Sequence, residues 1–189
     1  KDGTMVTASR TLKVPALPLV GDIYYSDGSW SSTYDTNKTP IGVVVSTNPD
    51  YCEKGSGYGH GLVMALKNCG SATSEYAWRN ENSDAGLDKI DTGKKMYNNK
   101  SGYLNTDTIV NNRPRTTMVT YSSTVFPAFY QAVNYSLGKA PKGSTGWFLP
   151  SMGQWWDVLE KVADYNGTSL GLSSKHADGS SYYYAGAGE

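Results

Sequence analysis

The apolar positions in the first third of the chain predict short β-strands. Residues 22–25 (Asp-Ile-Tyr-Tyr) are followed by the triplet Ser-Asp-Gly, which is typical of a turn at a strand end. Residues 41–47 form a continuous apolar run rich in β-branched side chains, and residues 60–67 form a second apolar run. The Gly-rich stretch 55–61 lies between them and predicts a flexible loop. Two buried strands joined in this way are expected to form a hairpin.

A helical period first becomes clear further along the chain. Residues 127–137 begin with Pro127, a residue that suits the first turn of a helix because its missing N–H needs no partner there. Phe129, Val133 and Leu137 recur at the spacing of one helix face. We therefore expect a helix over the whole segment, with these three side chains facing the core.

The strongest helix signal follows a capping box, in which Ser151 and Gln154 are expected to satisfy backbone groups of the first turn. Residues 166–167 (Asn-Gly) predict the end of this helix. Earlier in the chain, Thr106 is expected to cap a shorter helical turn over residues 107–110. Behind the capping box, large and apolar residues keep helical spacing and predict a core-facing stripe made of Met152, Trp155, Trp156, Leu159, Val162 and Ala163.

The first 19 residues combine a strand-like stretch with a proline-containing connector. Residues 4–14 alternate loosely between apolar and polar side chains, as a strand does, and Pro15 and Pro18 then favour an extended connector. We interpret residues 1–19 as a strand and linker from a preceding module. The main domain is expected to cover residues 20–189.

Composition narrows the class of protein. The 189 residues carry 17 Lys and Arg against 17 Asp and Glu, so the net charge of zero gives no electrostatic case for nucleic acid. No window approaches the length of apolar sequence that a membrane span needs. Aromatic residues are 15 Tyr and 5 Trp against 3 Phe, and these amphipathic rings favour a folded protein over a disordered one.

Cysteine and histidine are too scarce for a recognisable metal site. Cys52 and Cys69 are disulfide candidates, although two free thiols explain them equally well because the geometry decides. His60 and His176 are the only histidines, and neither a Cys-x-x-Cys nor a His-Glu-x-x-His pattern exists. We therefore expect no metal and no cofactor.

One segment carries a family resemblance. Residues 146–155, Gly-Trp-Phe-Leu-Pro-Ser-Met-Gly-Gln-Trp, resemble the Gly-Trp-x-Leu-Pro-Ser signature of a bacterial C-type-lectin-like domain. Residues 21–30, 41–45, 60–66 and 105–109 are also similar to pieces of that domain, in the same order. The set resembles the C-terminal modules of surface lipoproteins and pilus-tip proteins of Gram-negative gut bacteria, whose fold is related to the formylglycine-generating enzymes (sulfatase-modifying factors).

The resemblance covers roughly residues 21–172 and implies an α+β fold. In this C-type-lectin-like fold, two helices pack on a small twisted antiparallel sheet that carries long loops. Family members continue after the second helix with further strands, whereas this sequence stops at Glu189, and residues 182–185 stand about where that section begins. We therefore expect a fold that is truncated at its C-terminus or that replaces those strands.

The candidate ligand-binding residues come from the chemistry of sugar sites, which pair an aromatic platform with hydrogen-bonding side chains. Trp78, Arg79, Asn80 and Asn82 supply both parts within the stretch 70–103, which has almost no periodicity. A loop of that length in a compact domain is usually functional or mobile. The alternative interpretation is that Trp78 only anchors the loop on the core.

A second group of candidates is the aromatic run Tyr182, Tyr183 and Tyr184 in the Ser- and Gly-rich tail. The remaining tryptophans are expected mostly in the core, including Trp147, while Trp30 follows a turn and fits either environment.

From the resemblance and the candidate binding residues we expect a non-catalytic, adhesin-like module. Its expected ligand is a glycan or a surface protein of the host or of a bacterium. Its expected location is extracellular or on the outer-membrane surface. An alternative is a structural subunit or tip component of a filament or pilus, with residues 1–14 pairing with a neighbouring module. An enzyme of the sulfatase-modifying fold is a third option. It is disfavoured because the reactive cysteines of those enzymes come late in the domain, whereas Cys52 and Cys69 come early.

Overall fold

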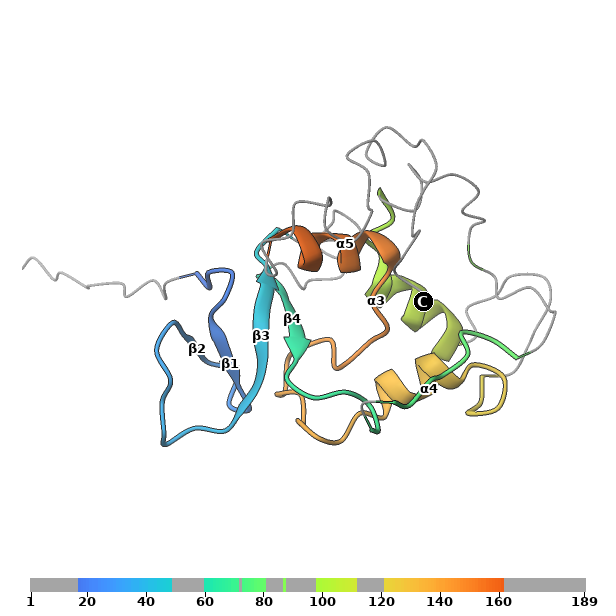
Figure 1. Cartoon of the computed structure of the whole chain (residues 1–189), viewed down its shortest axis with the longest axis horizontal. Helices are drawn as coiled ribbons and strands as arrows, with labels where there is room; N and C mark the ends of the chain where they lie inside the picture. Colours follow the sequence, from blue (N-terminus) through green and yellow to red (C-terminus); the bar gives the residue numbers. More distant parts are fainter. Residues whose placement is uncertain are drawn as a thin grey trace, which may run out of the picture.

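The computed structural model of the chain describes residues 17–48, 60–71, 73–80, 87, 98–111 and 121–161, with the backbone alone described at 160 and 161. Within them it has a mixed α+β architecture with a four-stranded antiparallel sheet at one end of the long axis and three helices toward the other (Figure 1). The strands are β1 (Ile23–Tyr25), β2 (Trp30–Ser31), β3 (Pro40–Ser46) and β4 (Leu62–Ala65), and the helices are α3 (Gly102–Val110), α4 (Pro127–Val133) and α5 (Met152–Lys161).

The sheet has the strand order β2-β1-β3-β4, and every neighbouring pair is antiparallel. The hairpin prediction is confirmed, because β3 pairs with β4 in a register that places Val43 opposite Met64. The expected burial of β4 is wrong, however: all four of its residues are only half-buried. Among the described strands β4 lies at the edge of the sheet, so it has a covering neighbour on one side only.

The strand β3 is the buried centre of the sheet. Val44 is 2% exposed, and Tyr25 of β1 is 1% exposed. The Tyr25 hydroxyl accepts a hydrogen bond from the Asp35 backbone N–H at 2.8 Å and donates to the Thr33 carbonyl at 3.3 Å. These bonds satisfy the polar end of a buried ring, which allows tyrosine to serve here as a core residue. The helix α5 packs against β3 (Figure 1).

A second core lies between α3 and α4. Ile109, Phe126 and Phe129 are each 2–3% exposed and form its centre. Partly buried apolar residues pack around them from several segments, namely Leu87, Tyr121, Val125 and Leu149. Because Phe126 precedes α4 and Phe129 lies within it, this helix is held by its first turn.

The extent of α4 and the role of Thr106 both differ from the sequence-based predictions. The helix α4 ends at Val133 rather than at residue 137, and both Val133 and Leu137 are exposed, so the expected apolar face is wrong beyond Phe129. Thr106 is not a cap but a buried residue inside α3. Its hydroxyl accepts a hydrogen bond from the Leu149 N–H at 3.2 Å, which ties α3 to the segment before α5.

The core-facing stripe that the sequence predicts behind Ser151 is only partly present on α5. Trp156 is buried and Leu159 is half-buried, but Met152 and Trp155 are exposed, and Val162, Ala163 and residues 166–167 lie outside the described residues. The buried side of α5 instead carries Gln154 and Asp157. Half of the predicted capping box is present: the Gln154 side chain accepts from the Ser151 N–H at 3.0 Å, whereas the Ser151 hydroxyl donates to the Asn99 carbonyl at 2.6 Å.

The polar side of α5 is satisfied by the segment that leads into α3. The Lys100 ammonium contacts the Asp157 carboxylate at 2.6 Å, and the Asp157 side chain is only 6% exposed. Gly102 stands against the first turn of α5 so closely that a Cβ atom there would contact the Gln154 side chain and lie 2.8 Å from the Ser151 nitrogen. A residue without a side chain is therefore required where the first turns of α3 and α5 meet.

None of the helices described is long and apolar enough to cross a membrane.

Candidate functional site

Trp78 packs on the helical core and still reaches the surface. Its ring meets Phe129 edge-on at a centroid distance of 5.4 Å and Phe126 at 6.4 Å, while 46% of the residue remains exposed. Edge-to-face pairs of this kind add about 0.5–1.5 kcal/mol beyond the area that they bury. The two interpretations of Trp78 that the sequence left open are therefore combined, because the residue anchors its loop and also presents an aromatic surface.

The backbone around Trp78 is fastened to the chain that leads into α4. The Ala128 N–H donates to the Ala77 carbonyl at 3.1 Å, and the Asn80 N–H donates to the Val125 carbonyl at 3.0 Å. The Asn80 side-chain amide donates to the Thr124 carbonyl at 2.8 Å. Bonds on both sides of Trp78 fix the position of its Cα atom, so the indole is held in place before any ligand arrives.

Arg79 lies over the same indole. Its guanidinium carbon is 5.8 Å from the Trp78 ring centroid, within the range of a cation–π contact. The residue is half-buried. One face of the indole is thus covered by a cation, and the exposed remainder of the ring adjoins it.

Two hydroxyl groups complete this part of the surface. The Ser122 and Thr124 side-chain oxygens are 3.0 Å apart and share a hydrogen bond. Because Asn80 is bonded to Thr124 and Val125, these hydroxyls lie next to the Trp78 loop although they are more than forty positions away in sequence. We call the set Trp78, Arg79, Asn80, Ser122 and Thr124 the Trp78 surface.

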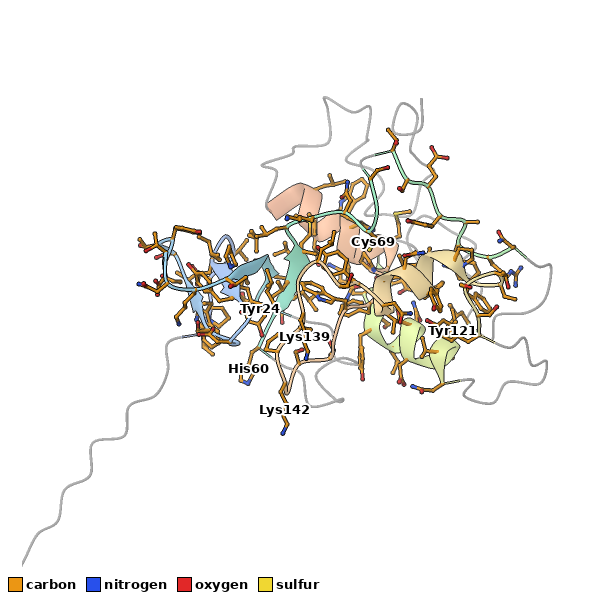
Figure 2. All side chains as sticks on the ribbon, turned by 90° about the horizontal axis from the view of Figure 1, so that it is seen from below. Tyr24, His60, Cys69, Tyr121, Lys139 and Lys142 are labelled. Carbon is orange, nitrogen blue, oxygen red and sulfur yellow. The ribbon has the colours of Figure 1, made fainter. Side chains whose placement is uncertain are left out.

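Tyr121 packs against the helical core around Phe126 and Phe129. Its ring packs against Tyr130 at a centroid distance of 6.0 Å, and its hydroxyl is buried. Burial raises the pKa of Tyr121 above its ordinary value, Tyr130 adds a smaller increase, and Asn134 partly offsets both. Tyr121 lies at the helical end of the molecule, far along the long axis from Tyr24 on the sheet (Figure 2).

The other predicted binding residues cannot be added to this surface. Asn82 and the run Tyr182, Tyr183 and Tyr184 lie outside the described residues, so their part in a site stays a prediction. The same holds for the strand expected within residues 1–14.

Among the described residues Cys69 has no disulfide partner, and Cys52 lies outside them. The Cys69 sulfur is 3.7 Å from the Gln131 carbonyl oxygen, and burial raises the pKa of the thiol. A half-buried thiol with a raised pKa has little of the thiolate form at neutral pH, which makes it a poor nucleophile. The disulfide with Cys52 stays a prediction.

The remaining tryptophans divide between core and surface. Trp156 is buried, and Trp147 and Trp30 are half-buried. The Trp147 indole donates to the Gly138 carbonyl and meets Tyr135 edge-on at 5.3 Å. Trp155 was expected in the core but is 44% exposed on the outer side of α5.

No group of three or more His, Cys, Asp or Glu side chains that could hold a metal occurs among the residues that the structure describes.

Comparison with known proteins adds no relative. A scan against protein-family models, a search of curated proteins and a search of solved structures each found no match to this chain.

The sequence indicated Trp78, Arg79 and Asn80 but missed Ser122 and Thr124. Nothing in residues 121–126 marks them in the sequence, because short hydroxyl-bearing stretches are common throughout this chain. Their placement depends on the Asn80 hydrogen bonds, which only the folded chain brings together.

Proposed function

We propose that this chain is a non-catalytic ligand-binding module of adhesin type, displayed on a bacterial surface, and that the Trp78 surface contacts a glycan or protein ligand. The observation that carries the proposal is the state of Trp78: 46% exposed, yet packed against Phe126 and Phe129. An aromatic ring that is already fixed loses little conformational freedom when a ligand docks on it, so more of the contact energy appears as affinity.

The finer fold assignment, a C-type-lectin-like domain, is part of the same proposal. It is supported by the structural roles of the Gly-Trp-Phe-Leu-Pro-Ser segment. Leu149 bonds to Thr106 of α3, Ser151 bonds to the Asn99 carbonyl, and Gln154 caps the first turn of α5. Residues of one short motif thus hold two helices together, which is what a fold-defining signature is expected to do.

The Trp78→Ala variant tests the proposed site. We expect its binding to the strongest hit on a glycan array or a panel of host surface proteins to fall about tenfold or more, because buried aromatic anchors dominate binding energies. Trp155→Ala is the matched control, since Trp155 is 44% exposed against 46% for Trp78 but lies on α5. Biolayer interferometry on both variants gives the two dissociation constants.

Thermal unfolding of both variants checks that the fold is intact, and Trp78→Phe retains the packing on Phe129 if the alanine variant is unstable. The proposal would be contradicted if Trp78→Ala and Trp78→Phe bound as the parent does, or if Trp155→Ala alone lost binding.

A further inference from the structure

Arg79 is a half-buried cation that has no hydrogen-bond acceptor among the described residues. Within the described part of the chain it forms no ion pair and no hydrogen bond, and its guanidinium lies 5.8 Å from the centroid of the Trp78 ring. A guanidinium carries five N–H donors, and partial burial removes some of the water that would otherwise satisfy them. The donors are therefore available to an anion that arrives with a ligand.

The acidic side chain within residues 73–80 does not neutralise Arg79. Glu75 is the one acidic residue among residues 73–80, and it is exposed and forms no ion pair with the guanidinium in the described residues. Arginine held against an aromatic ring loses less side-chain freedom on binding than a free one does. Its planar fork also matches the two oxygens of a carboxylate or sulfate group.

The rest of the Trp78 surface suits a sugar ring. The Asn80 side-chain nitrogen donates to the Thr124 carbonyl. The amide oxygen has no donor among the described residues, so it can accept from a sugar hydroxyl. The Ser122 and Thr124 hydroxyls can donate or accept, because either atom can be the donor in their shared bond. The exposed part of the Trp78 indole offers an apolar face to sugar C–H groups.

We infer that the Trp78 surface binds an acidic sugar residue, with the sugar ring on Trp78 and its carboxylate or sulfate group on the Arg79 guanidinium. The inference rests on the proposed function and makes it more specific. It favours an acidic glycan over an acidic peptide, because the described residues of this surface pair one cation with an aromatic face and hydroxyl groups.

The test is a glycan array in which each carboxylated oligosaccharide stands beside its methyl ester and each sulfated one beside its desulfated form. A polyglutamate peptide is included on the same surface. Parent protein, Arg79→Gln, Arg79→Lys and Trp78→Ala are applied to it. The parent is expected to bind at least one acidic glycan about tenfold more tightly than its neutralised form.

Arg79→Gln should remove that tenfold preference and bring the acidic glycan to the level of its neutralised form. Arg79→Lys keeps the charge but loses the planar fork, so it should retain a part of the preference. Trp78→Ala should lower binding to both forms. The methyl esters and the desulfated glycans separate a carboxylate ligand from a sulfate ligand.

Three outcomes would overturn the inference, and they differ in what they say of the proposed function. In the first outcome, neutral glycans bind best, Arg79→Gln binds them as the parent does, and Trp78→Ala does not bind them. The acidic sugar is then wrong, but the proposed binding site remains. Capture of the polyglutamate peptide without any acidic glycan would likewise leave only the site. If no probe binds, or if the Arg79 and Trp78 variants bind as the parent does, the inference and the proposed function fail together.

Discussion

The Lys100→Met variant is expected to lose about 3 kcal/mol of unfolding free energy, because it removes one partner of a buried ion pair and weakens the stabilisation of the buried charge that remains. The charge concerned is the Asp157 carboxylate, which is 6% exposed and 2.6 Å from the Lys100 ammonium. This pair joins the segment before α3 to the buried side of α5, so its loss weakens the attachment of both helices. Urea unfolding followed by circular dichroism measures the change.

The chain offers a matched control in a second ion pair. Lys38 contacts Asp27 at 3.0 Å, but the two side chains are 34% and 51% exposed. Exposed pairs contribute little, so Lys38→Met should cost much less unfolding free energy than Lys100→Met. Equal losses in the two variants would show that the Lys100 pair is not buried in solution.

The Gly42→Ala variant is expected to lose about 3 kcal/mol of unfolding free energy or to fail to fold, because overpacking a strand pair forces the backbone to move. A Cβ atom at Gly42 would contact the Val63 side chain and lie 2.7 Å from the Met64 carbonyl oxygen. Neither neighbour can retreat easily, since Met64 is paired with Val43 in the register of β3 and β4. Chemical denaturation again gives the measurement.

A double variant keeps this prediction testable even if the single one does not fold. Val63→Ala removes the methyl groups that the new side chain at position 42 would meet, although the Met64 carbonyl remains. The Gly42→Ala, Val63→Ala double variant is therefore expected to fold and to be more stable than Gly42→Ala alone. A double variant no more stable than Gly42→Ala, or a Gly42→Ala protein as stable as the parent, would contradict the close approach of β3 and β4.

The sequence-based predictions that are confirmed depend on residues that lie close together in the sequence. The apolar run that became β3, the hairpin with β4 and the proline that begins α4 are all confirmed. The two-residue strand β2 was missed because Trp30 and Ser31 are too few to show a period.

The predictions that failed depended on which neighbour a residue meets. Leu137 has the spacing of a core residue but lies beyond the end of α4 and is exposed, and Trp155 has the same spacing in α5 but faces outward. The reason is that α5 turns Gln154 and Asp157 inward, where the Ser151 backbone and Lys100 satisfy them. Such polar pairs form between segments far apart in sequence, and no local period reveals them.

The candidate site likewise combines features that the sequence predicts with contacts that only the folded chain shows. The chemistry of Trp78, Arg79 and Asn80 was visible in the sequence because aromatic, cationic and amide side chains stand together in a stretch without periodicity. The packing of Trp78 on Phe129 and the hydrogen bond from Asn80 to Thr124 were not visible, since both span more than forty residues. These long-range contacts are what turn three adjacent side chains into a fixed surface.

The most direct test of this account compares the two exposed indoles in one sample. The protein is labelled with 15N, and the indole N–H signals of Trp78 and Trp155 are assigned through Trp78→Phe and Trp155→Phe and followed by NMR while the strongest array glycan is added. A ligand bound at the Trp78 surface is expected to shift the Trp78 signal to saturation and to leave the Trp155 signal in place. A saturating shift at Trp155 with none at Trp78 would contradict this expectation.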